Sequence, residues 1–563
     1  MPEYPEIKNE ETAAEQSIQP NPFLPGYKPH IPEKKEHKPL NKIEKIFIAV
    51  FFVLSFILVD FALFHGFHLG FTVAYVLLFA GATVFLWNKE KRPSVFALLC
   101  GIISLAGSMT FALYCNTLVN AFMLILVAGL FTIYCLGISS GFNHENGGFR
   151  LLIDVFLGVV IEPFGNISDA AGALKATLKT ERKNTSVLKG ILLALPVLII
   201  IIPLLISGDA AFEGLISSLG ENIGIYLLEI ALSVPVFIFG YSFMYGKRNG
   251  LNKKSAKAFE MNGKTISVSS CVSFLSVISA TYLVYLFSQL AYFFSAFNGI
   301  LPEGYTRGTS MFARRGFYEM FAVCVINVVI VSVISLLVKK NEKGKNPIPV
   351  KILSLFVSLF SVLLIVVAMV KMKLNIETYG FTRNRLLVSV FMIMMLIIIA
   401  FFIAHIFMPK IRYMQPIIII CSVMFVALSF ANIDNITYTY NAKAHLNGTI
   451  EEFDVYNIND YEPAEKYLVK AIKDGVLAPA SKNMLAEDVY YSDEYEVDVT
   501  KCMVTAVKSD IRSFCLEKEK SKKIVTEYFA SLTPGDKLWF EQLFANVVYD
   551  GKDETFSGED YDW

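Results

Sequence analysis

The chain contains a succession of apolar segments, most of them near 20 residues long, joined by polar links. About 20 apolar residues is the length with which an α-helix crosses the hydrocarbon core of a membrane. Because no water is available there, the backbone of each crossing segment must satisfy its own hydrogen bonds as a helix. Hydrophobic residues form 54% of the chain and charged residues only 18%, which excludes an ordinary soluble protein of this length. The sequence therefore predicts an all-α integral membrane protein.

We predict about eleven transmembrane helices. They cover residues 45–64, 69–87, 94–113, 118–138, 188–207, 222–244, 267–296, 316–338, 350–370, 386–408 and 413–431. The segment 151–163 is too short to cross, and we interpret it as an interfacial or re-entrant piece. A crossing at 151–163 would reverse the side of every later segment.

Lysine and arginine are retained on the cytoplasmic side of membrane proteins. With a cytoplasmic amino terminus, most lysines and arginines before residue 432 fall in inner loops. The carboxyl-terminal part then lies outside a bacterial cell membrane, and it is acidic, with 26 Asp and Glu against 14 Lys and Arg. The predicted parts are a disordered cytoplasmic arm (1–44), a four-helix membrane part (45–138), a basic cytoplasmic loop with the interfacial segment (139–187), a seven-helix membrane core (188–431), a small, mainly helical extracytoplasmic domain (432–550) and a disordered tail (551–563).

Two predicted outer loops break the charge rule, and both carry arginines next to a span. The first reads "MFARRGFYEM" and holds Arg314 and Arg315; the second reads "YGFTRNR" and holds Arg383 and Arg385. Arginines on the outer side, where this rule disfavours them, indicate a local interaction partner. Arginines at helix ends, however, also extend toward lipid headgroups without such a partner. Arg315 and Glu319 are four residues apart, so a helix would place them on one face. They either hold a ligand or close the helix end as an ion pair.

A third polar motif, "NIDNITYTYN", follows the last predicted span on the same face. Arginine offers a forked set of donors suited to phosphate or carboxylate, and tyrosine suits the headgroup region. The candidate ligand-binding residues are Arg314, Arg315, Glu319, Tyr379, Arg383, Arg385, Asp434, Tyr440 and Asn441. Two further carboxylates, Asp60 and Glu229, lie within predicted spans, where each must face protein or water.

No sequence motif indicates a cofactor, a metal centre or nucleic-acid binding, so none is expected. His65 and His68 are only weak evidence for a metal. Six of the eight cysteines, among them Cys115, lie in or beside apolar segments and are interpreted as small buried hydrophobes. Cys502 and Cys515 lie in the acidic part and could pair with each other in an oxidising space.

The three polar motifs resemble a family of bacterial multi-spanning proteins grouped as domain of unknown function 4173, which is related to the 4153 group. The resemblance rests on "ARRGFYEM", "YGFTRNR" and "NIDNITYTYN" and covers roughly residues 180–445. Phe381 stands where leucine is usual in that family. The resemblance implies a shared residue set, Arg315, Glu319, Tyr379, Arg383, Asp434 and Asn441, and it implies no activity.

Three functions fit these features. The first is a non-enzymatic envelope or sensory protein that binds an anionic lipid headgroup or small anionic solute outside the membrane and couples it to the acidic domain. The second is an ion-coupled transporter or flippase, which Asp60, Glu229, Glu319 and kinked spans would serve. The third is a membrane enzyme acting on a lipid-linked substrate. The first is favoured because arginines, tyrosines and carboxylates converge on one predicted face.

Overall fold

A computed structural model gives the fold. It describes residues 38–87, 93–139, 150–180, 223–250, 266–298, 317–339, 346–408, 411–450, 461–477 and 514–544, with the single positions 148, 197, 201, 341, 453 and 458. These residues are helical and contain no strand beyond one isolated bridge, between Ile266 and Val338. The predicted all-α class is confirmed over this part of the chain.

The helices are described in chain order. They are α1 (Lys42–Val59), the π-helical turn η1 (Asp60–Phe64), α2 (Leu69–Leu86), α3 (Val95–Leu113), α4 (Thr117–Ser139), α5 (Arg150–Phe156), the π-helical turn η2 (Leu157–Ile161), α6 (Glu162–Thr180), α9 (Ile223–Asn249), α11 (Val268–Asn298), α13 (Phe317–Leu337), α14 (Ile348–Tyr379), α15 (Arg383–Phe407), α16 (Met414–Phe430), α17 (Ile433–Leu446), α18 (Ala464–Lys473), α21 (Leu516–Ser531) and α22 (Pro534–Phe544).

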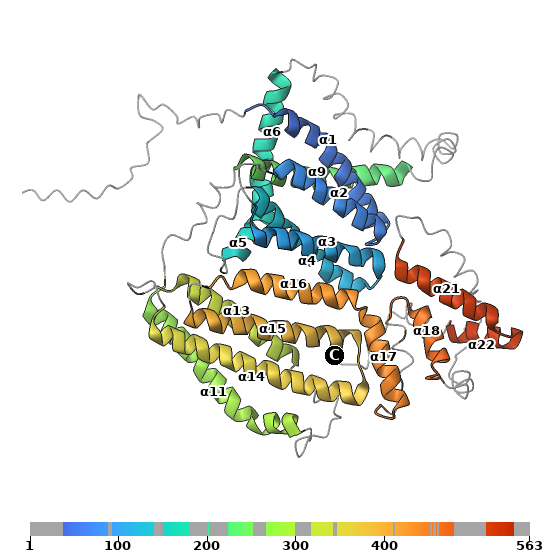
Figure 1. Ribbon diagram of the computed structural model, residues 1–563. Helices are drawn as coiled ribbons and strands as arrows, with labels where there is room; N and C mark the ends of the chain where they lie inside the picture. Colours follow the sequence, from blue (N-terminus) through green and yellow to red (C-terminus); the bar gives the residue numbers. More distant parts are fainter. Residues whose placement is uncertain are drawn as a thin grey trace, which may run out of the picture.

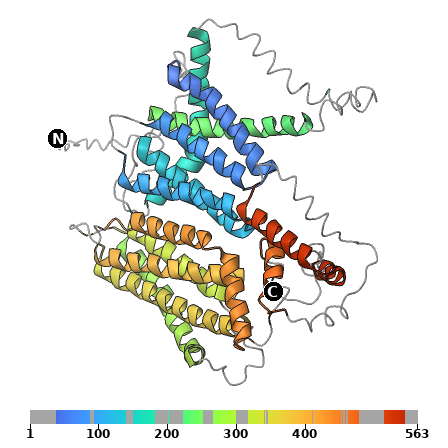
Figure 2. The same cartoon turned by 45° about the vertical axis from the view of Figure 1, so that its right-hand side comes forward.

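Within the described ranges, nine helices are long and apolar enough to cross a membrane, or ten if α16 and α17 count as one span bent by 63°. Figures 1 and 2 show α3, α4, α14, α15 and α16 running broadly side by side. Hydrophobic clusters join α3 and α4 to α15 and α16, and join α13 to α14 and α15. The prediction of a multi-pass membrane protein is confirmed, whereas the predicted span 188–207 falls largely outside the described residues.

The segment predicted as an interfacial piece at 151–163 belongs to a longer helical stretch, since α5, η2 and α6 follow one another without a break. Its part Leu151–Thr177 passes the length and hydropathy test for a span. In both ribbon views, however, α6 runs across the direction of α3, α4 and α14 to α16. Its Thr177 hydroxyl accepts a hydrogen bond from the Leu40 backbone at the start of α1, 2.7 Å away. The prediction that this segment is too short to cross is therefore wrong, and its interfacial position stays a prediction.

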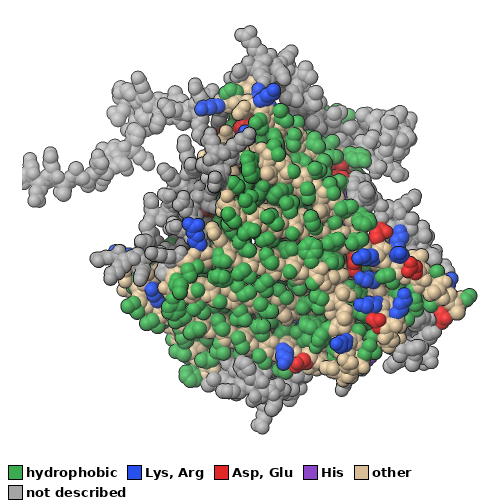
Figure 3. Space-filling view, viewed as in Figure 1, with side chains coloured by type: hydrophobic (Ala, Val, Ile, Leu, Met, Phe, Trp, Pro, Cys, Tyr) green, Lys and Arg blue, Asp and Glu red, His purple; other side chains and the backbone are tan. Residues whose placement is uncertain are grey.

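Helices α17, α18, α21 and α22 form a separate hydrophobic core, which we call the C-terminal cluster. Tyr438 of α17, Tyr467 of α18 and Phe540 of α22 are fully buried in it. The cluster sits where α3 and α16 end and where α4 and α15 begin (Figure 1). The surface of the long helices in Figure 3 is almost wholly hydrophobic, while charged side chains gather over the cluster.

Candidate functional site

The turn between α14 and α15 is built by the predicted motif "YGFTRNR". Gly380 ends α14 with φ of 75°, a left-handed conformation that costs glycine little. Thr382 then caps α15, its hydroxyl accepting a hydrogen bond from the Arg385 backbone. Arg385 donates to the Tyr379 and Gly380 carbonyls at 3.3 and 2.7 Å. The guanidinium of Arg385 therefore closes the turn that precedes its own helix.

The same turn is joined to α17 by the third predicted motif. The Asn441 carboxamide accepts from the Phe381 backbone N–H and donates to the Phe381 carbonyl, both at 2.7 Å. The Phe381 ring packs edge-on against Tyr440, with centroids 4.6 Å apart. Two motifs that lie 60 residues apart in sequence thus form one unit.

Arg383, in the same turn, forms an ion pair with Asp434, the most buried charged residue of the site. Its Nε and Nη2 bind the two Asp434 carboxylate oxygens at 3.0 and 3.2 Å, a two-pronged pairing. The Asp434 side chain is only 2% exposed. Burial raises the pKa of Asp434, and the positive charge of Arg383 and the hydrogen bonds act in the opposite direction. The carboxylate therefore depends on its partners to keep its charge.

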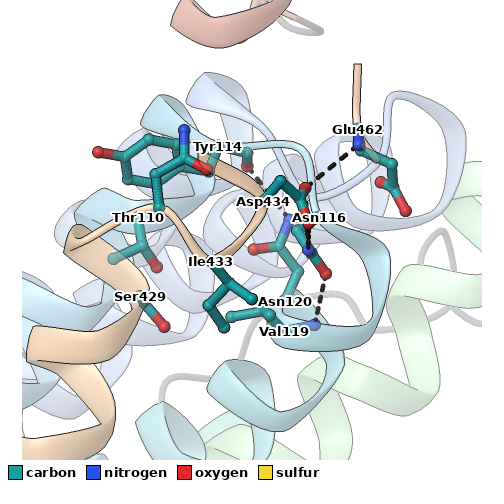
Figure 4. A pocket seen from close by; sticks show the side chains of 10 residues that line it. Thr110, Tyr114, Asn116, Val119, Asn120, Ser429, Ile433, Asp434 and Glu462 are labelled. Atoms are coloured by element: carbon teal, nitrogen blue, oxygen red, sulfur yellow. Dashed lines mark hydrogen bonds between the residues drawn. The ribbon is translucent and has the colours of Figure 1, made fainter. Parts of the chain in front are cut away.

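Two of these partners come from distant parts of the chain. Asn116 Nδ2 donates to both Asp434 oxygens at 3.2 Å, and the Glu462 backbone N–H donates to Oδ2 at the same distance. The Glu462 side chain binds Arg383 Nη1 at 3.3 Å and accepts from the Thr117 backbone N–H at 2.9 Å. Figure 4 shows Asn116 and Asp434 pointing toward each other beside Glu462. We call Asn116, Arg383, Asp434 and Glu462 the latch, because it joins α4, α15 and α17 to the segment before α18.

Asn116 and Glu462 were not predicted from the sequence. Asn116 does have a recognisable local role, because its side-chain oxygen accepts from the Val119 backbone N–H at 3.1 Å and so caps α4. Its position in "CNT" between two apolar segments is typical of a cap, but a cap gives no clue to a second partner 318 residues away.

The remaining predicted residues lie elsewhere. Arg314 and Arg315 lie outside the described residues, so their pairing with Glu319 stays a prediction. Glu319 is exposed on the first turn of α13. Asp60 binds His65 Nδ1 at 3.2 Å at the end of α1. Glu229 is buried in α9.

The volumes of three cavities indicate the size of ligand that each could hold. The cavity beside the latch has a volume of about 10 Å³, close to the smallest that admits one water molecule. A second cavity, of about 310 Å³, lies between the membrane helices and the C-terminal cluster. The second cavity is lined by Leu113, Tyr114, Phe430, Ala431, Asn432, Asn435, Lys466, Leu516, Glu517 and Lys520. The third, an apolar groove of about 530 Å³, runs between α4, α5, α13, α15 and α16. The latch residues are thus engaged with one another beside a water-sized cavity, and their binding of a ligand stays a prediction.

The second cavity, which we call the junction pocket, carries both signs of charge. Lys466 of α18 is paired with Glu517 of α21, and Glu517 also accepts from Asn432 at 3.1 Å. Lys520 lies one turn further along α21 and is exposed. With Lys466 and Glu517 neutralising each other, Lys520 gives the junction pocket a net positive charge.

No group of three or more potential metal ligands occurs among the residues that the structure describes. The apolar spans and the latched C-terminal cluster define the chain as a multi-pass membrane protein. It belongs to the family described as domain of unknown function (DUF4153), whose model matches residues 74–464. That family is the 4153 group, and the link to the 4173 group is not shown. No curated protein and no solved structure matches the chain.

Proposed function

We propose that the protein binds an anionic group, of a phospholipid headgroup or a small solute, in the junction pocket at the extracytoplasmic face of a bacterial cell membrane. The observation that carries this proposal is that the residues lining the pocket come from both the membrane helices and the C-terminal cluster. Leu113 and Phe430 end two membrane helices, whereas Lys466 and Lys520 belong to the C-terminal cluster. A ligand there touches both parts at once, so its binding couples the membrane helices to the cluster.

The charge of the pocket supports an anion. A lysine ammonium is a compact point charge that suits phosphate, and Asn432 and Asn435 add carboxamide groups. The pocket volume of about 310 Å³ is at the lower end of those of small-molecule sites. It is far larger than the water-sized cavity at the latch, so the ligand site is proposed here and not at Arg383.

The sidedness in this proposal comes from the charge rule, and the helix directions support it. The latch and the junction pocket gather the ends of α3 and α16 with the starts of α4 and α15. The loops at these ends were all predicted to be outside together with the acidic part. We therefore propose a cytoplasmic amino terminus and an extracytoplasmic C-terminal cluster.

Lys520→Gln tests the site, with Lys523→Gln as the matched control. Both lysines are exposed on α21, but Lys523 lies outside the pocket and faces Glu527 at 3.9 Å. We expect binding of phosphatidylglycerol nanodiscs to the detergent-purified protein to fall several-fold in Lys520→Gln and to stay unchanged in Lys523→Gln. Competition by inorganic phosphate at millimolar concentration would identify a free solute anion as the ligand. Equal binding by both variants and the parent would refute the proposal.

The apolar groove supports a second candidate, the handling of a lipid-linked substrate. Its walls are formed by side chains such as Phe122, Leu130, Phe391 and Phe425, and it lies among helices that cross the membrane. A hydrocarbon or isoprenoid chain is the chemistry that such a wall accepts. The transporter alternative rests on Asp60, Glu229 and Glu319, which lie on three different helical elements, η1, α9 and α13.

A further inference from the structure

Two cysteines from opposite ends of the chain meet at the junction between the membrane helices and the C-terminal cluster. Cys115 lies in the three-residue link between α3 and α4, and Cys515 is the N-cap residue of α21. Their side chains are in hydrogen-bond contact with each other. The Cys515 thiol also donates a hydrogen bond to the Leu113 carbonyl, 3.5 Å away. The predicted partner of Cys515, Cys502, lies outside the described residues, and Cys115 is buried as its sequence context indicated.

The position of Cys515 is fixed by neighbouring contacts. The Leu69 backbone N–H at the start of α2 donates to the Phe514 carbonyl at 3.0 Å. Two residues after Cys515, the Glu517 carboxylate binds Lys466 and Asn432. The segment 514–517 is therefore held against both the membrane helices and α18, which keeps the two sulfur atoms together.

The pKa values of the two thiols are shifted in opposite directions. The hydrogen bond from Cys115, with the backbone N–H groups of Lys518 and Glu517 at the start of α21, lowers the pKa of Cys515 to about 7. A helix N-terminus favours the negative thiolate for the same reason that it binds other anions. The pKa of Cys115 is raised, because its proton is held by Cys515 and the site is buried. Cys515 is thus the more acidic of the two thiols and the one that more readily becomes the nucleophilic thiolate.

We propose that Cys115 and Cys515 form a redox modification site at which a peroxide oxidant converts the two thiols into a disulfide that joins α21 to the α3–α4 link. The Cys515 thiolate attacks one peroxide oxygen, the O–O bond breaks, hydroxide leaves, and Cys515 becomes a sulfenic acid. The Cys115 sulfur then attacks the Cys515 sulfur, the S–O bond breaks, and water leaves. In total, two thiols lose two electrons and two protons, and one hydrogen peroxide is reduced to two waters.

The junction pocket lies next to this buried pair. The exposed fractions of Cys115 and Cys515 are 6% and 1%, which excludes large reagents. The chain neighbours of both cysteines, Tyr114 and Leu516, line the junction pocket. Hydrogen peroxide is of the size of one or two water molecules, and the pocket of about 310 Å³ accommodates it easily. The other described cysteines, Cys100, Cys135, Cys271, Cys324 and Cys421, lie inside helices and serve as internal references.

The experiment uses the full-length protein in detergent micelles. It is treated with hydrogen peroxide, unfolded in N-ethylmaleimide to block remaining thiols, digested, and mapped by mass spectrometry. We expect a peptide pair that links Cys115 to Cys515, with loss of maleimide from both positions together and recovery of both after dithiothreitol. Persistent maleimide on both cysteines after peroxide, or a Cys515 link to Cys502 instead, would overturn the proposal.

Single variants separate the two roles. In Cys115→Ser, Cys515 should stop at the sulfenic acid and be trapped by dimedone. In Cys515→Ser, Cys115 should remain a thiol through the same treatment, because it lacks the neighbouring nucleophile. A Cys115 that is oxidised equally in Cys515→Ser contradicts the assigned order of attack. If a variant does not fold, the linkage map of the parent protein decides alone.

Discussion

The latch makes a quantitative prediction for Arg383→Met, which keeps most of the apolar stem and removes the guanidinium. Asp434, with its side chain 2% exposed, would lose its two-pronged partner and keep only Asn116 and the Glu462 backbone N–H. Removing one partner of a buried ion pair typically costs about 3–5 kcal/mol. Because Arg383 is 14% exposed and Asp434 keeps two donors, we expect the lower end, about 3 kcal/mol.

The free energy is to be measured as the local unfolding of the C-terminal cluster, by pulse proteolysis of the full-length protein in detergent micelles across a urea series. Lys373→Met is the matched control. Lys373 forms an ion pair with Glu377 at 3.5 Å on α14, but the side chains are 73% and 51% exposed. An exposed pair of this kind contributes less than about 1 kcal/mol.

A double variant tests whether the loss belongs to the pair. Asp434→Asn combined with Arg383→Met removes both charges, so the combined loss should fall short of the sum of the single losses by about 0.5–3 kcal/mol. The reasoning is refuted if Arg383→Met destabilises the cluster no more than Lys373→Met does. Strict additivity of the two substitutions would refute the direct coupling.

Two further predictions use glycines with matched controls. In Gly380→Ala, at φ of 75°, the new Cβ would lie 2.5 Å from Asn441 Oδ1, whereas in Gly475→Ala, at φ of 71°, it meets no atom within 4 Å. Both should lose about 1–3 kcal/mol through backbone strain, and Gly380→Ala at least about 1 kcal/mol more through displacement of Asn441. Equal losses in the proteolysis assay would contradict this. Gly129 lines the apolar groove, and an added Cβ there meets no atom within 4 Å, as is also true at Gly240. Gly129→Leu should therefore occupy part of the groove and reduce the lipid that native mass spectrometry detects on the protein, whereas Gly240→Leu should not. Unchanged lipid in Gly129→Leu would exclude the groove as a chain-binding site.

Hydropathy located most helices well, and its errors have a physical cause. The predicted span 94–113 compares with α3 at Val95–Leu113, because the helix ends where the apolar run ends. The predicted span 350–370 compares with α14 at Ile348–Tyr379, which continues for nine residues past the apolar run. Hydropathy reports where a chain is apolar, whereas a helix continues through polar residues until something stops it. For α14 the stop is Gly380 in its left-handed conformation.

The candidate site was predictable in part. Arg383 and Asp434 were selected because each is a charge near a span, and the structure brings them together. Their shared contacts with Asn116 and Glu462 were not predictable, because these residues join the latch across 318 and 79 residues of sequence. Charge at a membrane boundary is a property of one residue, which a sequence shows. A tertiary partner is a property of two residues, and this sequence shows neither which pairs form nor how two helix ends face each other.

All three residues of the link between α3 and α4 contact the carboxyl-terminal half of the chain. Tyr114 donates its hydroxyl to the Phe430 carbonyl at 2.9 Å, Cys115 contacts Cys515, and Asn116 binds Asp434. Each consecutive residue therefore contacts a different segment of the carboxyl-terminal half. A shift of α21 or α17 must displace this link, and the link is continuous with α3 and α4. A ligand in the junction pocket and a disulfide at Cys115 would consequently act on the same few backbone atoms, so the two proposed events should influence each other. Oxidation that leaves phosphatidylglycerol binding unaltered would show that the link is rigid enough to keep them independent.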